Sequence, residues 1–403
     1  MKSYRSIFLL AGLVQGALAA QADLASIIAD AQAQTVPSRR ASIIFIQCHG
    51  LGFGDLSCYG QTNYQTPNLD RLAAEGMRFT SYHAGSTDFA AAQAALMTGK
   101  SSSTSETLAP GGITVAQQLQ QAGYGTGLIG EWRLGATPWT QGFDEFAGFI
   151  QPEEGRNYFA DYLWRYAPES ILNETNHHME TYVGKEMLFP NVGGKKGQYL
   201  PDFFATMTVN FVRTHQPDQF NNYRPFFLFV SLPAPRSSTS LADDFPVPTD
   251  APFTGENWPQ AAKNRAALIT RLDNGIGRLF EELQKLQLTN NVAIFFTSAC
   301  GSEKFHDARL NFMRADDEVS QGQPRVPMMV RWPGTVPAGR VSSLPWGARD
   351  FGPTAVKIAS AKPPASFTGI SILPMLRGEP DTNSPVLRAD HRLDLDPKAP
   401  QGQ

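Results

Sequence analysis

Cysteine and charge are both scarce in this chain. Its 403 residues include 3 cysteines and 18% charged residues, and the formal net charge is −3. Three cysteines are too few for the dense disulfide framework that holds small secreted scaffolds together. A charge so close to neutral also excludes the electrostatic attraction that draws basic proteins to nucleic acid or to an anionic membrane. We therefore expect no nucleic-acid partner.

Long apolar runs are missing beyond the N-terminus. Residues 1–22 read MKSYRSIFLLAGLVQGALAAQA, in which Lys2 and Arg5 precede a short apolar run and small residues follow. This order is typical of a secretory signal peptide. A membrane anchor fits less well, because the run is short and Gln15 interrupts it. We predict a secreted or periplasmic protein with no membrane span.

Short apolar runs predict the strands of a buried sheet. Each is almost continuously apolar, as strands covered on both faces are. Helical patterns lie between them and alternate with them, which indicates an α/β domain with a large, mostly parallel mixed sheet flanked by helices. Residues 151–200 are predicted to be a long insertion over one end of the sheet. The predicted strands are 42–46, 125–130, 226–232, 292–296 and 326–332, and the predicted helices lie within 66–79, 114–124 and 258–288.

Ligands of such sheets bind beyond the carboxyl ends of the strands. The segments at these places are QCHG (47–50), EWRLG (131–135), PAPR (233–236) and TSACG (297–301). They are the first places to look for a functional site.

The chain resembles the sulfatase family of the alkaline phosphatase superfamily over residues 41–378. Many segments carry this resemblance in the same order, and the rest of the sequence, 379–403, forms a polar C-terminal tail in place of the small C-terminal subdomain that the family normally has. The matching segments are GLGFGDLSCYGQTNYQTPNLDRLAAEGMRFTSYHA, AALMTGK, AGYGTGLIGEWRLG, GFDEFAGF, PFFLFVSLPAP, RLDNGIGRLFEEL, FFTSACG and RVPMMVRWPGTVPAG.

The resemblance implies a sulfate-ester hydrolase. A family member attacks the ester with a formylglycine, made from the first residue of a C/S-x-P-S-R signature. It holds one divalent cation, usually calcium, with two adjacent aspartates after the first strand and an Asp-Asn pair after FFTS. Lysine and histidine side chains hold the sulfate oxygens. A hard cation needs oxygen ligands, and developing negative charge needs cationic donors.

This sequence departs from the family at each of these positions. The formylglycine position is Phe89, which cannot be oxidised to a formylglycine, and Gln93 closes the altered signature. The aspartate pair falls on Cys48 and His49, and calcium is therefore not expected. The other replacements are Glu131, Arg133, Arg236 and, near the late lysine, Asp316 for the cationic residues, and Ala299 and Cys300 for the Asp-Asn pair.

Three readings of Cys48, His49 and Cys300 remain open. A Cys48–Cys300 disulfide suits an exported protein. Alternatively, the two thiolates and the imidazole hold zinc, with Asp88 or Asp55 as fourth ligand. In the third reading, the two cysteines are simply buried and the histidine is hydrogen-bonded.

The replaced cationic residues have two interpretations. Pairs such as Glu131–Arg236 or Arg133–Asp316 would neutralise the altered cavity. Alternatively, Arg133 and Arg236 bind an anion, since guanidinium groups pair with sulfate or carboxylate. Ser86, Thr87 and Asp88 precede Phe89, and we interpret them as a helix N-cap rather than as a replacement nucleophile.

We predict an exported pseudo-sulfatase, catalytically inactive, with a binding or structural role and without a cofactor. Its partner would be a glycan, another protein or a second copy of the chain. The alternative is an active sulfuric or phosphoric ester hydrolase with a rebuilt metal centre.

Overall fold

The apolar runs form one large sheet in this computed structural model, which describes residues 40–101, 108, 112–167, 184–237, 245–301, 319–320 and 323–379. The predicted signal peptide of residues 1–22, Asp316 and residues 380–403 of the predicted tail lie outside the described residues. The fold and the sites described below belong to the compact unit that begins at Arg40. In the described part of the chain, no helix is both long and apolar enough to cross a membrane.

The sheet has ten strands in the order β13-β2-β12-β9-β1-β8-β4-β5-β6-β7. Its centre, from β9 to β5, is parallel, and the strands beyond it on each side begin with antiparallel pairs. The strands are β1 (Ser42–Cys48), β2 (Met77–Phe79), β4 (Gly125–Glu131), β5 (Glu145–Phe149), β6 (Leu163–Ala167), β7 (Gly184–Leu188), β8 (Phe226–Leu232), β9 (Val292–Ser298), β12 (Met328–Arg331) and β13 (Arg340–Ser342). Two small sheets pair β3 (Tyr82–His83) with β14 (Trp346–Gly347) and β10 (Val319–Ser320) with β11 (Gln323–Pro324).

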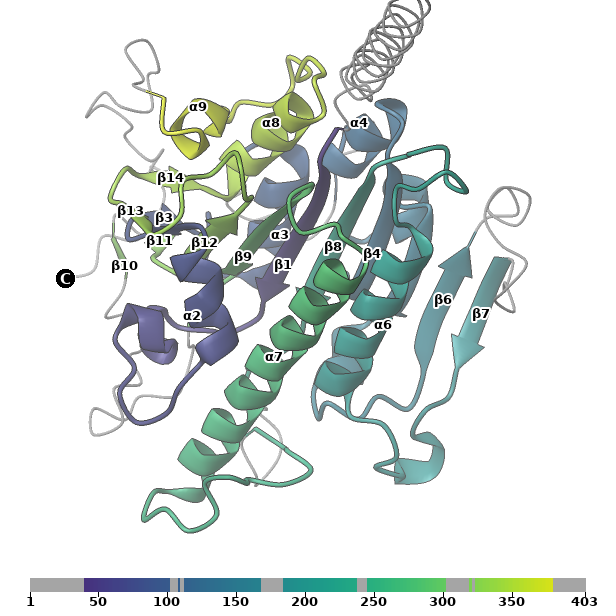
Figure 1. Ribbon diagram of the computed structural model, residues 1–403. Coiled ribbons are helices and arrows are strands. Elements are labelled where there is room, and N and C mark those ends of the chain that lie inside the picture. The colour runs from purple at the N-terminus through teal and green to yellow at the C-terminus, as the bar shows by residue number, and fades with distance from the viewer. Residues whose placement is uncertain are drawn as a thin grey trace, which may run out of the picture. The chain divides into compact units, whose positions relative to one another are not determined.

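Helices cover both faces of the sheet (Figure 1). One apolar core joins the sheet to α2, α6 and α7, and a second joins it to α3, α4, α8 and α9. Alternate residues of β1 enter the two cores, with Ile44 and Ile46 in the first and Phe45 in the second. The helices are α2 (Pro67–Ala74), α3 (Phe89–Thr98), α4 (Val115–Gln121), α6 (Leu200–Thr214), α7 (Gln260–Lys285), α8 (Ala348–Ile358) and α9 (Leu373–Leu376).

The predicted α/β fold class is confirmed, but one strand runs in the other direction. Residues 326–332 were expected to form a parallel strand, whereas β12 is antiparallel to both of its neighbours. All residues of β12 are buried, so its sequence is an apolar run whether the strand is parallel or antiparallel to its neighbours. The periodicity of the sequence therefore does not indicate the strand direction. Within residues 151–200, β6 and β7 extend the sheet at the edge beyond β5.

Candidate functional site

The carboxyl ends of β1, β4, β8 and β9 meet at one edge of the sheet. Cys48 at the end of β1 is in register with Leu232 of β8 and Ser298 of β9, and β4 ends beside β8 at Glu131. The first turn of α3 reaches the same place. The described residues that sequence analysis singled out therefore come together here, while Asp316 lies outside the described residues.

A buried glutamate is the centre of the site. Its two carboxylate oxygens face three basic side chains: Oε2 lies 3.2 Å from His49 Nδ1, and Oε1 lies 3.3 Å from Arg133 Nη1. Arg236 Nη1 lies 3.5 Å from the same Oε1 of Glu131. The Glu131–Arg236 pair predicted from the sequence is confirmed. Arg133 makes its ion pair with Glu131, two residues before it, from the loop that follows β4.

These neighbours keep Glu131 charged. Burial by itself would raise the pKa of Glu131, but His49, Arg236 and Arg133 outweigh burial and lower the pKa to about 2. Buried charges persist only where partners compensate their lost hydration. At neutral pH the site thus holds one carboxylate and two guanidinium groups.

An apolar cluster lies against the histidine. Phe89 begins α3, and its ring stacks on the His49 imidazole with the centroids 4.1 Å apart. Ala92 and Ala299 pack around the same phenyl ring. A histidine oriented by a carboxylate is the base of a nucleophile triad. The group stacked on this imidazole is a phenyl ring, which has neither a hydroxyl nor a thiol to activate.

The start of α3 is capped as expected. The side chain of Asp88 accepts a hydrogen bond of 2.8 Å from the Ala91 amide, and Ser86 Oγ accepts one of 3.1 Å from the amide of Asp88. Asp88 is therefore engaged as an N-cap. This confirms the capping interpretation of this segment.

Gln93 fixes α3 to the end of β4. Its Nε2 donates to the Glu131 carbonyl at 3.0 Å and lies 3.2 Å from Ser231 Oγ. Its Oε1 accepts from the Arg133 amide at 2.9 Å. Both the nitrogen and the oxygen of the buried Gln93 amide are thus hydrogen-bonded within the protein. Its contacts hold the backbone on either side of Trp132 in place.

Among the described residues, the cysteines show neither the predicted disulfide nor a cluster of ligands for zinc. Of the residues described, Cys48 and Cys300 are buried thiols that no disulfide joins, so the third reading is the one observed. Within the same part of the chain, no group of three His, Cys, Asp or Glu could hold a metal ion. Cys48 enters the core beneath α7 while His49 stacks on α3 at the other face. Successive residues of an extended strand point to opposite faces, so these two side chains diverge.

The thiol of Cys48 is also a poor ligand. Burial and the nearby Asp55 raise its pKa, and metals bind the thiolate rather than the thiol. These residues do not fit calcium either, because a hard cation requires several oxygen ligands. The carboxylates nearest this edge, Glu131 and Asp55, are already paired with basic side chains.

A second buried ion pair braces the loops around the site. Asp55 Oδ2 lies 2.5 Å from Arg265 Nη2 and accepts from the Gly52 amide at 2.6 Å. Arg265 also donates to the carbonyls of Gly50 and Pro235 at 3.0 and 2.9 Å. Asp55, which the zinc reading offered as a fourth ligand, instead braces this turn. Sequence analysis missed Arg265, although a charged residue one turn before Leu268 on the apolar stripe of α7 was a signal for it.

The two arginines of the site keep donors that the protein does not use. Among the residues described, Arg236 Nη2 is buried and has no hydrogen-bond partner. The Tyr158 hydroxyl donates to the Arg236 carbonyl and holds this residue at the site. The Arg133 side chain is 21% exposed and bonds Glu131 through Nη1. Guanidinium groups in this situation can accept an oxyanion.

Comparison with known proteins gives the same family throughout. The family model described as Sulfatase matches residues 41–361. The N-acetylgalactosamine-6-sulfatase of Canis lupus familiaris is 28% identical over 377 residues, covering 86% of this chain and 67% of that protein. The N-acetylgalactosamine-6-O-sulfatase of Bacteroides thetaiotaomicron is also 28% identical, covering 76% of this chain and 70% of its own length. The chain thus spans about two thirds of the mammalian relatives it matches.

Solved structures share the fold. The complex of Ps i-CgsB with k-i-k-neocarrahexaose superposes with a TM-score of 0.64 at 26% identity, covering 84% of this chain and 77% of that one. A structure in complex with its substrate D-glucosamine-2-N,6-O-disulfate gives a TM-score of 0.66 at 22% identity, covering 86% and 82%. With the family model matched over most of the chain, this protein belongs to the sulfatase family.

Proposed function

We propose that this sulfatase-family protein has lost ester hydrolysis and serves as a binding protein for an anionic sugar. The observation that carries the proposal is the stack of Phe89 on His49. The resemblance assigns the attacking formylglycine to position 89. A phenyl ring there supplies no nucleophile, because it has neither a hydroxyl nor a thiol.

The charges of the site support the same function. Glu131 stands where the resemblance expects a lysine and pairs with His49, Arg133 and Arg236. Arg133 and Arg236 stand where the resemblance expects cationic residues that stabilise the charge developing on a sulfate, and here both guanidinium groups contact a carboxylate. Cys48, His49, Ala299 and Cys300 offer no oxygen side chain to a hard cation.

Binding is still supported by the arginines. The two guanidinium groups share one carboxylate, and Arg236 Nη2 has no partner among the described residues. An oxyanion such as a sulfate would pair with these donors. The names of relatives direct the choice of ligand toward sulfated N-acetylgalactosamine. The signal-peptide pattern of residues 1–22 supports export of the protein. An exported protein would meet such sugars outside the cytoplasm.

Two measurements test this proposal. Purified protein is incubated with an aryl sulfate and an aryl phosphate, with calcium, with zinc and with a chelator. We expect no turnover; hydrolysis that the chelator abolishes would establish the alternative, a rebuilt metal centre. Binding of N-acetylgalactosamine 6-sulfate is then compared between wild type, Arg236→Gln and the control Arg156→Gln, whose ion pair is exposed. Loss of binding in Arg236→Gln alone is the expected result.

A further inference from the structure

We propose that a second pocket, at the opposite edge of the sheet, binds an anionic saccharide. The pocket has a volume of about 310 Å³ and lies at the amino ends of β4 and β8, where Gly125 and Phe226 line it. β4 extends from Gly125 to Glu131, so strand geometry puts about 20 Å between this pocket and the first site. The inference does not depend on the function proposed above.

The loop before β8 is folded so that two aromatic rings reach the solvent. Asp218 Oδ1 accepts from the amides of Phe220 and Asn221, at 2.9 and 3.0 Å. The Phe220 side chain is 67% exposed and that of Tyr223 is 48% exposed, and both line the pocket. Exposed aromatic rings at a pocket rim offer flat apolar faces. The C–H face of a sugar ring is a suitable partner for them.

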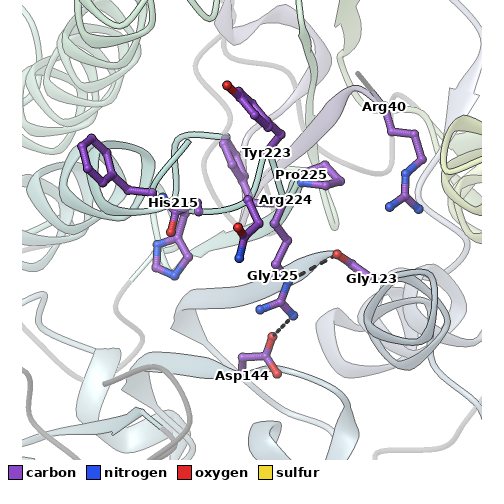
Figure 2. Close-up of a pocket in the computed structure, with 12 residues that line it drawn as sticks. Arg40, Gly123, Gly125, Asp144, His215, Tyr223, Arg224 and Pro225 are labelled. Atoms are coloured by element: carbon purple, nitrogen blue, oxygen red, sulfur yellow. Dashed lines mark hydrogen bonds and ion pairs between the residues drawn. The ribbon is translucent and has the colours of Figure 1, made fainter. Parts of the chain in front are cut away.

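A fixed guanidinium group forms the floor. Arg224 Nε donates to the Gly123 carbonyl at 3.3 Å, and Nη2 donates to the Tyr124 carbonyl at 2.8 Å. The same Nη2 lies 3.4 Å from Asp144 Oδ2 (Figure 2). These contacts use Nε and Nη2, so Nη1 is the donor that remains for a ligand.

A second guanidinium group lies across the glycine turn. Arg40 donates through Nη1 to the Ala122 carbonyl. Gly123 has a φ of +85°, and a Cβ there would lie 3.4 Å from Arg40 Nη2. Glycine thus allows both the left-handed backbone and the close approach of this arginine. Arg40 and Arg224 thereby reach the same short turn from two sides.

The acidic groups of the pocket are already occupied. Asp144 pairs with Arg224 and accepts from Gln120 Nε2 at 2.5 Å and from the Thr126 amide at 3.1 Å. His215, which also lines the pocket, pairs with Glu145 behind it, with 2.9 Å between His215 Nε2 and Glu145 Oε1. The residues that line the pocket thus include two guanidinium groups, Arg40 and Arg224, and one carboxylate, Asp144, which favours an oxyanion. Together with the aromatic rim, this selects a sugar that carries a carboxylate or a sulfate.

The test uses ligand-observed NMR titration of the full chain carrying Arg236→Gln, so that binding at the first site is not measured. The probes are glucuronic acid, N-acetylgalactosamine 6-sulfate and neutral galactose. We expect binding of at least one of the two acids and none of galactose. The acid that binds shows whether the pocket accepts a carboxylate or a sulfate. Binding of neither acid, or of galactose as tightly as an acid, overturns the proposal.

Variants then assign the binding to this pocket. Loss of a charge-assisted contact in Arg40→Gln should weaken acid binding about tenfold. Tyr223→Ala should weaken it and reduce saturation transfer to the sugar ring protons. Both positions are exposed, so neither change threatens folding. The matched control Arg156→Gln should bind as the parent does. Parental affinity in both pocket variants would overturn the proposal even if an acid binds elsewhere.

Discussion

The ring of Phe89 stacks on the imidazole of His49, with centroids 4.1 Å apart and planes inclined by 11°. On its other side, His49 contacts the Glu131 carboxylate through Nδ1 at 3.2 Å. An apolar ring and a buried charge thus hold the same imidazole. The region that the resemblance assigns to chemistry is therefore packed like a protein core, and the first predictions concern its stability.

Phe89→Ala should destabilise the fold without removing anion binding. Deleting a buried phenyl ring leaves a cavity beside His49, Ala92 and Ala299, which costs about 3–5 kcal/mol in the free energy of unfolding. Urea denaturation measures this difference. Phe220→Ala, at an exposed ring, is the control and should change stability by about 0.5 kcal/mol or less. Equal effects in the two variants would contradict the packing described.

Glu131→Gln should be costly although it preserves shape. The amide leaves His49, Arg133 and Arg236 without their shared counter-charge, and breaking a buried ion pair costs about 3 kcal/mol or more. Thermal and urea unfolding measure the change. Glu153→Gln removes an exposed pair with Arg156 and should cost at most about 1 kcal/mol. A loss for Glu131→Gln no larger than that of this control would refute the central role of the carboxylate.

Acid should remove the contribution of Glu131. Its pKa in the folded protein is about 2, against an ordinary value of 4.5, so its stabilisation is complete above pH 4.5 and is lost as the pH falls toward 2. Lowering the pKa of Glu131 by this amount corresponds to about 3 kcal/mol in the free energy of unfolding. The difference between the unfolding free energies of wild type and Glu131→Gln should shrink as the pH falls from 4.5 toward 2.5. A difference independent of pH down to 2.5 is the contrary outcome.

The buried thiols should react slowly in the native state. Burial raises the pKa of Cys48 and that of Cys58, and only the thiolate attacks a thiol reagent efficiently. Labelling with a disulfide reagent should therefore require unfolding. Alkylation in denaturant without a reductant should then modify Cys48 and Cys300, as read by peptide mass spectrometry. A non-reduced peptide linking these two cysteines would show the disulfide instead.

His215 should stabilise the protein most at mildly acidic pH. Burial alone would lower its pKa, but Glu145 outweighs burial and raises it above the ordinary value of 6.5. The stabilisation is therefore complete below pH 6.5 and is lost as the pH rises through the raised pKa. The unfolding free energy of wild type should exceed that of His215→Gln by more at pH 6 than at pH 9. A larger difference at pH 9 would contradict the ion pair.

The five strands predicted from the sequence all lie in the large sheet, whereas β2, β5, β6, β7 and β13 of the same sheet were not predicted. The run 226–232 coincides with β8, and β1, β4 and β9 each begin where the apolar runs begin. Each run is continuously apolar because it is covered on both faces, and that is a local property of the chain. The direction of β12 was not local, since it depends on which strand its backbone pairs with in space.

The sequence by itself determined the family and the sheet, and it predicted the loss of the family's usual residues at the strand ends. Residue identity is enough for those conclusions, because Phe89 has no oxidisable group wherever it lies. Only the tertiary structure decided how the replacements are arranged. Strand alternation sends Cys48 and His49 to opposite faces, and packing of three separate segments brings His49, Arg133 and Arg236 around Glu131. The contacts of Glu131 with His49 and Arg236 join residues that are far apart in sequence. They depend on the tertiary fold, and no local sequence pattern encodes them.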